Sequence, residues 1–291
     1  MNSHITIGMD LGDTNHIAVV LDAQGREMEI KKVNNTKVSV KRFFQKYSGA
    51  TVAIEAGTHS AWISRLIEGL NCRVSVGNPY KLRVIWDSTD KSDERDARML
   101  AIVCRLEPRL LWPIHHRGEN AHNDLEVIKA RDILVQSRTK LINHVRSVVK
   151  STGERLPKCS SESFAARVVS MLPEPLRPAL MPLMDTIVSI TDRIRGLEKK
   201  INSLSKDQYP EIQRLRQVPG VGPVTALAYV LTLEDPKRFG KSRQVGPYLG
   251  LTPRRDQSGD TDKQLRITKA GNVYLRKLLV GCAHYIMGPF G

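Results

Sequence analysis

The sequence predicts a mixed α/β domain at the N-terminus, then a long-helix region, then a mainly α-helical C-terminal domain. Three β-prone runs follow one another up to residue 33, and helical and strand patterns then alternate as far as residue 106. Beyond residue 122, apolar residues recur at helical spacing over two long stretches. We therefore expect three regions, which cover residues 1–115, 116–208 and 209–291.

The N-terminal region is expected to contain five strands and three helices. The strands are predicted over residues 5–12, 16–21, 27–33, 50–55 and 72–76. The helices are predicted over residues 38–47, 61–70 and 92–106, and Ser92 is suited to cap the last of them. A three-strand meander followed by helix–strand alternation is the element order of an RNase-H-like fold.

Two basic helices are predicted in the middle region. Apolar residues recur at helical spacing over residues 123–150, and a second, near-heptad pattern covers residues 187–204. A proline-rich stretch is expected to interrupt the chain between them; its prolines are Pro173, Pro175, Pro178 and Pro182. The pattern favours a coiled-coil arm for dimer or RNA contacts, and the core of an ordinary helical bundle fits it equally well.

The charge balance indicates a polyanionic partner. The 291 residues include 45 Lys and Arg against 30 Asp and Glu, a formal net charge of +15. Nucleic acid is the simplest partner for such an excess. No apolar run approaches the roughly 20 residues that span a bilayer, and the N-terminus has no secretory signal pattern. We expect no membrane association.

The four cysteines argue against two classes of small domain. Cys72, Cys104, Cys159 and Cys282 lie far apart, and none belongs to a C-x-x-C pair. This spacing excludes a zinc knuckle and a disulfide framework, and it favours a reducing cytoplasm.

Four carboxylates could form one site. Asp10 ends the first strand and Glu55 ends a later one, so parallel pairing of these strands would bring the two together. Asp93 and Asp96 are three residues apart at the start of a helix, so both can face the same side. Four converging carboxylates repel one another unless divalent cations neutralise them, and such oxygen ligands suit Mg²⁺. Two such ions can cleave a phosphodiester.

Each acid also has a simpler explanation. Asp93, like Glu94, could complement the dipole of a helix N-terminus, and this is the preferred explanation for Glu94. Asp10 could be a turn residue after its strand. Glu55 ends an apolar strand, where a carboxylate needs compensation. The set of four carries more weight than any single member.

Two glycine-containing segments near the C-terminus could contact phosphates. Gly220 and Gly222 precede an apolar helix, as in a helix-hairpin-helix, and a tight turn between packed helices is the equal alternative. Ser258 lies in Gln257-Ser258-Gly259 and could act as a nucleophile, although Ser-Gly in a basic segment is more often only a turn. Cations that could hold a phosphate flank it: Arg254, Arg255, Lys263, Arg266 and Lys269.

The ordered set of motifs resembles one protein family along nearly the whole chain. The motifs are Gly8-Met9-Asp10-Leu11-Gly12, Ile54-Glu55-Ala56-Gly57, Asp93 to Ala97, Val218 to Gly222, Gly250 to Pro253, Gln257 to Gly259 and Ile267 to Arg276. Together they resemble an insertion-sequence transposase with a RuvC-like Asp-Glu-Asp-Asp domain and a C-terminal serine-containing domain. In this family a structured noncoding bridge RNA guides transposition.

The resemblance implies specific roles. Asp10, Glu55, Asp93 and Asp96 would bind Mg²⁺, and Ser258 would form a covalent 5′-phosphoserine bond to DNA. Family members work as tetramers in which serine and carboxylates of different protomers complete each active site, so a dimer or tetramer is expected. DNA at the element ends and at the target, together with the bridge RNA, would be the partners. A cytoplasmic protein associated with the bacterial nucleoid is implied.

Two departures from the family pattern leave other functions open. Gln257 stands where relatives often carry a first serine, and the sequence stops at Gly291, where relatives usually continue for some tens of residues, which suggests a shortened copy. One alternative is a Holliday-junction-resolvase-like nuclease that uses water as the nucleophile. Another is a nucleic-acid-binding relic without activity.

Overall fold

The protein forms two compact units, residues 1–116 and 117–291. The computed structural model describes residues 4–82, 92–258 and 261–288. Gly259 of the predicted Gln257-Ser258-Gly259 motif lies outside these residues. No helix in the described part of the chain is both long and apolar enough to cross a membrane.

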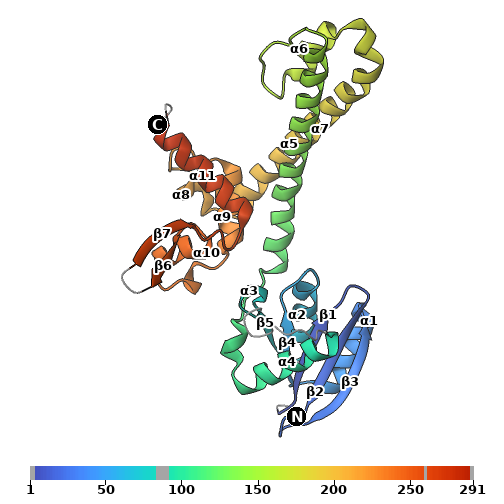
Figure 1. Cartoon of the computed structure of the whole chain (residues 1–291), viewed down its shortest axis with the longest axis vertical. Coiled ribbons are helices and arrows are strands. Elements are labelled where there is room, and N and C mark those ends of the chain that lie inside the picture. The colour runs from blue at the N-terminus through green and yellow to red at the C-terminus, as the bar shows by residue number, and fades with distance from the viewer. Residues whose placement is uncertain (1–3, 83–91, 259–260, 289–291) are drawn as a thin grey trace. The chain divides into compact units, whose positions relative to one another are not determined.

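The first unit is built on a five-stranded mixed sheet (Figure 1). Its strands are β1 (Thr6–Leu11), β2 (Asn15–Leu21), β3 (Glu27–Asn34), β4 (Thr51–Glu55) and β5 (Arg73–Gly77). The order in the sheet is β3-β2-β1-β4-β5. The first three strands pair antiparallel as a meander, whereas β4 pairs parallel to both β1 and β5. All five predicted strands and the mixed α/β class are confirmed, and the order is consistent with an RNase-H-like fold.

Helices cover both faces of this sheet. They are α1 (Lys37–Phe44), continued by a 3₁₀ turn (Gln45–Tyr47), α2 (Ser60–Glu68), α3 (Pro79–Leu82), α4 (Asp93–Leu106) and a 3₁₀ turn (Pro108–Leu111). On one face, Ile7 and Met9 pack with Phe44 and Ile63 of α1 and α2. On the other face, α4 lies directly against β1 and β2. Side chains alternate between faces along a strand, so Asp10 shares the α4 face with Gly8.

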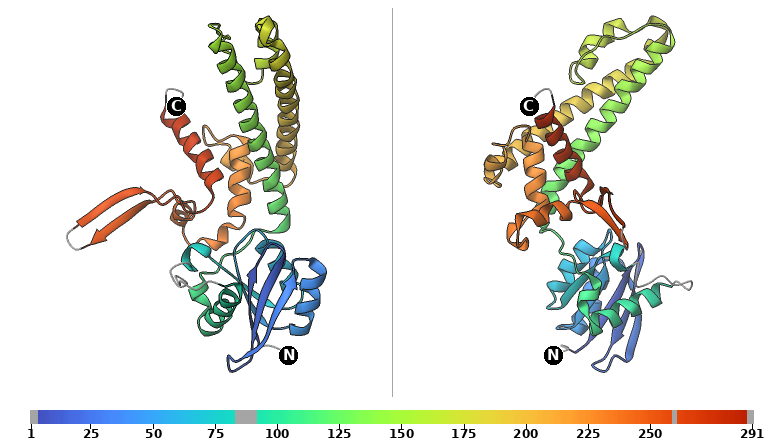
Figure 2. Two further views of the ribbon diagram at one scale, coloured as in Figure 1. Left: turned by 45° about the vertical axis from the view of Figure 1, so that its right-hand side comes forward. Right: turned by 60° about the vertical axis from the view of Figure 1, so that its left-hand side comes forward.

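Two long antiparallel helices dominate the second unit, and Figures 1 and 2 show them side by side. These are α5 (Glu119–Ser151) and α7 (Arg177–Asp207); α6 (Phe164–Val168) and the 3₁₀ turns Val169–Met171 and Glu174–Leu176 lie between them in the chain. At one end of the pair, Val145 packs with Ile187 and with Phe164. At the other end, Leu125 and Leu204 join the core of the C-terminal helices. The predicted long helices are thus confirmed, with separate apolar clusters at the two ends.

The proline-rich interruption between the two long helices is shorter than the sequence predicts. Helix α7 begins at Arg177 and contains both Pro178 and Pro182. Pro178 lies in the first turn, where the missing N–H has no intrahelical partner to lose. Pro182 has no N–H, so the helix lacks one backbone hydrogen bond there. Its neighbours Leu180 and Met184 are both buried, and their packing stabilises this part of the helix. Because this apolar packing stabilises its first turns, α7 begins ten residues before the predicted start at residue 187.

The C-terminal part of the second unit combines short helices with one hairpin. Its elements are α8 (Ile212–Leu215), α9 (Pro223–Leu233), 3₁₀ turns at Pro236–Arg238 and Ser242–Gln244, α10 (Val245–Tyr248), β6 (Pro253–Ser258), β7 (Thr261–Ile267) and α11 (Val273–Met287). Helices α9 and α11 supply its core, with Leu227, Leu231 and Leu275 buried. The hairpin strands were not predicted, because their residues are polar and lack an alternating apolar face.

Candidate active site

The four predicted carboxylates lie on one face and at one edge of the first unit. Met9 of β1 is opposite Ile54 of β4 in a parallel register, so the next residues, Asp10 and Glu55, lie at the same end of neighbouring strands. Strand alternation places Asp10 on the same face as Gly8 and Glu55 on the same face as Ala53. Ala53 packs with Leu100 of α4. Both strand-end carboxylates therefore lie on the side of the sheet that α4 covers.

Helix α4 approaches the sheet closely because Gly8 has no side chain. A Cβ on Gly8 would overlap the carbonyl oxygen of Ala97 and the amide nitrogen of Ala101. Ser92 caps the helix as predicted: its hydroxyl oxygen accepts a hydrogen bond of 3.3 Å from the amide of Arg95. This close contact brings the first turn of α4 to the edge where β1 and β4 end.

Electrostatics shows which acids share this edge. The pKa of Asp10 rises from its ordinary value of 3.8 to about 6, first because of burial, and then because of the negative charges of Asp93, Asp96 and Glu55. The backbone amide of Leu11 opposes the shift by donating a hydrogen bond to the carboxylate. Glu94, in the same helical turn, is not among the charges that act on Asp10. The structure thus separates Asp93 and Asp96 from Glu94.

The donor chemistry of this edge fits a divalent cation. Negative charges that lie close together repel one another less when a positive ion lies among them, and carboxylate oxygen is the donor that Mg²⁺ prefers. Within the described residues, no three His, Cys, Asp or Glu side chains are arranged to hold one ion as they stand. The acids would therefore have to converge on a bound cation.

A second polar cluster lies at the same edge of the sheet, and the sequence did not predict it. His59, just before α2, approaches Asp13 Oδ1 at 3.1 Å and Asn35 Nδ2 at 3.2 Å through Nε2. The buried ring of His16 lies 6.3 Å from that of His59, and burial and the charge of His59 lower its pKa. These residues lie apart in the sequence and follow no motif spacing, so the fold brings them together through the segments that follow β1, β3 and β4.

Ser258 stands in very different surroundings, in the second unit. It is the last residue of β6 and pairs with Thr261 of β7. All six residues of β6 are exposed. No described residue makes a hydrogen bond to the Ser258 hydroxyl. Among the residues of the hairpin that the structure describes, none supplies an activating base to this serine.

The cations predicted near Ser258 differ in their availability. Arg255 forms an ion pair with Asp262 across the hairpin, which lowers the pKa of that carboxyl group. The other four, Arg254, Lys263, Arg266 and Lys269, are exposed and make no ion pair with a described residue. Four of the five predicted phosphate-binding side chains thus remain open to a ligand.

Arg276 holds the base of the hairpin, a role that sequence reasoning did not assign. Its buried guanidinium donates hydrogen bonds to the carbonyl oxygens of Leu249, at 2.8 Å, and Ala270, at 2.6 Å. Gly250 has a φ of +67°, and a Cβ there would overlap the backbone of Ala270. Gly250 and Arg276, which both belong to the C-terminal motifs, therefore hold together the loops from which the hairpin extends.

The two glycines of the predicted phosphate-binding turn have different roles. Gly220 has a φ of +77°, and a Cβ there would come within 2.9 Å of the Tyr285 ring of α11. Gly222 caps α9 and has open space around it. The helix before the turn, α8, has only four residues, so a helix-hairpin-helix is not confirmed. Gly220 is explained by packing, whereas Gly222 leaves the start of α9 accessible.

Comparisons with known proteins match both units. Residues 7–153 match a DEDD family model described as a transposase, and residues 212–289 match one described as the transposase IS116/IS110/IS902 family. A probable family 20 transposase of Pseudomonas aeruginosa is 26% identical over 97% of this chain and 83% of the relative. The transposase for insertion sequence element IS1328 of Yersinia enterocolitica is 27% identical over the same shares. The transposase for insertion sequence element IS1111A of Coxiella burnetii is 27% identical over 82% of this chain and 66% of the relative.

Proposed function

Because the chain belongs to the IS110/IS116 family of insertion-sequence transposases, we propose that it cuts and rejoins DNA with both a carboxylate site and a serine nucleophile. The carboxylate site consists of Asp10, Glu55, Asp93 and Asp96, and the nucleophile is Ser258. The observation that carries the proposal is the placement of Glu55, Asp93 and Asp96 around Asp10, whose pKa rises first because of burial and then because of these three negative charges.

The carboxylates would hold Mg²⁺, which supplies a positive charge that stabilises the phosphate oxygens during strand cleavage. The protein's own contribution is to fix Asp10 and Glu55 on hydrogen-bonded strands and to bring Asp93 and Asp96 to them on a capped helix. In the absence of a cation, Asp10 holds a proton more readily than an ordinary carboxyl group. The cation therefore has to compete with that proton.

Ser258 would carry the covalent step. Its Oγ attacks a backbone phosphorus and forms a phosphoserine bond to the 5′ end, while the 3′ oxygen leaves and takes up the proton that the serine loses. A 3′ hydroxyl then attacks the phosphoserine, rejoins the strands and returns the proton to Ser258. The hydroxyl is weakly nucleophilic by itself. The exposed hairpin supports a step in which the activating groups come from outside the hairpin.

The remaining partners follow from the same family membership and from charge. With a net charge of +15, the chain is suited to hold nucleic-acid backbones, and a bridge RNA would choose the sites by base pairing. Gly222, at the open start of α9, and the exposed cations Arg254, Lys263, Arg266 and Lys269 are the proposed backbone contacts. A homodimer or homotetramer would bring serine and carboxylates of different protomers together.

The decisive test is a covalent protein–DNA adduct. Full-length protein is mixed with the RNA encoded beside the element, supercoiled target plasmid and Mg²⁺, and the products are separated on denaturing gels. We expect an adduct that Ser258→Ala abolishes and Ser242→Ala preserves, because Ser242 is an equally exposed serine of the same unit. Adduct formation by Ser258→Ala would refute the nucleophile.

Other outcomes identify the alternatives. DNA cleavage without any adduct, equal in both serine variants, would favour a resolvase-like nuclease that uses water. Binding of RNA or DNA without cleavage would favour a nucleic-acid-binding relic.

A further inference from the structure

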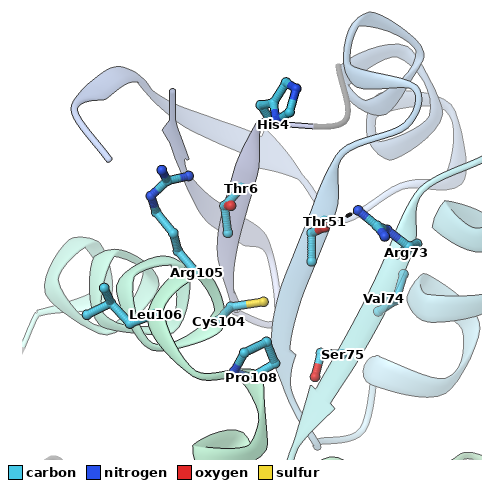
Figure 3. A pocket seen from close by; sticks show the side chains of 10 residues that line it. All are labelled: His4, Thr6, Thr51, Arg73, Val74, Ser75, Cys104, Arg105, Leu106 and Pro108. Carbon is cyan, nitrogen blue, oxygen red and sulfur yellow. Dashed lines mark hydrogen bonds between the residues drawn. The ribbon is translucent and has the colours of Figure 1, made fainter. Parts of the chain in front are cut away.

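A polar cavity opens at the edge of the sheet in the first unit that lies opposite the carboxylates, where β1, β4 and β5 begin (Figure 3). Its volume is about 620 Å³. Six of the side chains that line it come from the starts of these strands and from the last turn of α4: Thr6, Thr51, Arg73, Ser75, Cys104 and Arg105. No carboxylate is among them.

The cavity lies on the same face of the sheet as the acids. Thr6 has the strand parity of Gly8 and Asp10, and Thr51 has that of Ala53 and Glu55. Helix α4 runs along this face from its acidic first turn to Arg105, in its last turn. One helix thus connects a negative edge to a positive one.

Two arginines give the cavity its charge. Arg73 donates a 3.3 Å hydrogen bond to Thr51 Oγ1, which Figure 3 shows as a dashed line, and Arg105 donates to the carbonyl oxygen of Ala23. Neither guanidinium makes an ion pair with an acid in the part of the chain that the structure describes. The acid that follows α4, Glu107, is already paired with Arg109, whose Nη2 lies 2.7 Å from it. Most of the donors on both arginines therefore remain available.

The other polar groups of the cavity suit an anion. Thr6, Thr51 and Ser75 contribute hydroxyl groups, and His4 contributes an imidazole. Burial raises the pKa of Cys104 to about 11, so its thiol stays neutral and adds no negative charge. The carbonyl end of α4 carries a partial charge of only about −0.5, which the two guanidiniums outweigh.

We propose that this cavity binds a backbone phosphate of the DNA on which the transposase acts. Arginine is the side chain best suited to phosphate oxygens, because its planar donors can bind two of them at once. Hydroxyl groups are common additional phosphate ligands in protein–DNA complexes. The site would position the DNA without reading its sequence.

The length of α4 sets where along the strand this phosphate lies. Twelve residues separate Asp93 from Arg105, which corresponds to about 18 Å at 1.5 Å per residue. A nucleic-acid strand advances about 3.4 Å per nucleotide, so in a strand that runs along α4 the bound phosphate is about five nucleotides from the phosphate at the carboxylates. Only this spacing rests on the proposed cleavage site; binding of DNA in the cavity does not.

The first test measures DNA affinity in Mg²⁺-free buffer, where cleavage does not interfere. The affinity of the full-length protein for a labelled duplex is followed by fluorescence anisotropy over a range of KCl concentrations. For the double variant Arg73→Gln/Arg105→Gln we expect about tenfold weaker binding, as for loss of charged hydrogen bonds. We also expect the slope of log affinity against log salt to fall by about one, as for one lost phosphate contact. The control Lys37→Gln/Lys41→Gln removes the same charge from exposed positions of α1 and should bind within about twofold of wild type.

Neutral methylphosphonate linkages locate the contact. A series of duplexes carries one such linkage each, at successive positions. At one position the linkage should weaken binding by the wild-type protein and have no effect on binding by the double variant. Equal losses in the arginine and lysine variants would overturn the proposal, because the effect would then be one of net charge. A loss of RNA binding with DNA binding unchanged would overturn the assignment to DNA.

Two further measurements separate this site from folding and from catalysis. Arg73→Lys/Arg105→Lys keeps the charge, so it should retain most of the salt slope, and all variants should share one thermal unfolding temperature. At saturating DNA, Arg73→Gln/Arg105→Gln should still form the covalent adduct that Ser258→Ala abolishes. Failure of the adduct assay in wild type would count against the proposed chemistry and leave the binding result intact.

Discussion

The carboxylates and the serine are held in opposite ways. Asp10 and Glu55 lie at one end of two hydrogen-bonded strands of a five-stranded sheet, and α4 packs against the same face of that sheet. Ser258 ends a two-stranded hairpin in which every residue of β6 is exposed. The hairpin extends away from the helices of its own unit, as the left view of Figure 2 shows. The fold of the first unit therefore places the carboxylates at one edge of its sheet, whereas the surroundings of Ser258 depend on what binds to the hairpin.

The largest effect should come from the close contact beneath the carboxylates. Gly8→Ala puts a methyl group into the backbone of α4, so we expect a loss of about 3 kcal/mol in the free energy of unfolding. Gly57→Ala is the matched control, since a Cβ there meets nothing within 4 Å, and it should change stability by less than about 0.5 kcal/mol. Urea unfolding measures both. Equal stability of the two variants would mean that α4 does not depend on Gly8.

The next effect concerns the acids themselves. Asp10→Asn should slow Mg²⁺-dependent DNA cleavage about 100-fold or more, because a charged ligand is lost. Asp93→Asn and Asp96→Asn should act in the same direction. Glu94→Gln, in the same turn of α4, should leave cleavage within about threefold, since only the helix dipole is affected. Single-turnover cleavage rates would decide, and a defect in Glu94→Gln as large as that of Asp93→Asn would reject the distinction between them.

The third effect concerns the hairpin, which a substitution at its base should destabilise more than a substitution in its strands. Arg276→Met removes two hydrogen bonds from a buried guanidinium, and we expect a loss of about 2 kcal/mol in stability. Backbone amides of residues 254–258 and 261–267 should exchange hydrogen faster in this variant. Arg254→Met changes an exposed arginine of β6 and should leave exchange unaltered. Unchanged protection in Arg276→Met would show that the hairpin is held by other contacts.

The smallest effect is a dependence of stability on pH in the metal-free protein. The pKa of Asp10 is about 6 in the folded state and 3.8 ordinarily, so the folded state loses stability as pH rises between these values. Asp10→Asn removes this loss and should be more stable than wild type at pH 8 by about 1 kcal/mol, because Asp10 is only partly buried and solvent screens part of the interaction. Below pH 4 the advantage should vanish. Urea unfolding with EDTA at both pH values measures it, and an advantage that grows on acidification would contradict the sign.

Much of the site could be predicted because its signals are local. Strand ends mark Asp10 and Glu55, and the Ser92 cap fixes the first turn of α4, so that Asp93 and Asp96 fall where expected. The limits of β4 and of α4 follow from short-range preferences that the surrounding structure reinforces. The elements that failed prediction depend on distant packing. Helix α7 passes through Pro182 because buried neighbours retain it, and β6 forms although its residues have no apolar face.

The sequence by itself determined the types of chemistry: four carboxylates, one serine between glutamine and glycine, and an excess of basic residues. Only the tertiary structure separated Glu94 from Asp93, since the charge that reaches Asp10 depends on distance across the sheet edge. Only the tertiary structure gathered Arg73 and Arg105 into one cavity, because strand pairing and helix packing join residues whose spacing along the chain has no period. Local sequence fixes which groups exist, and the fold decides which of them act on one another.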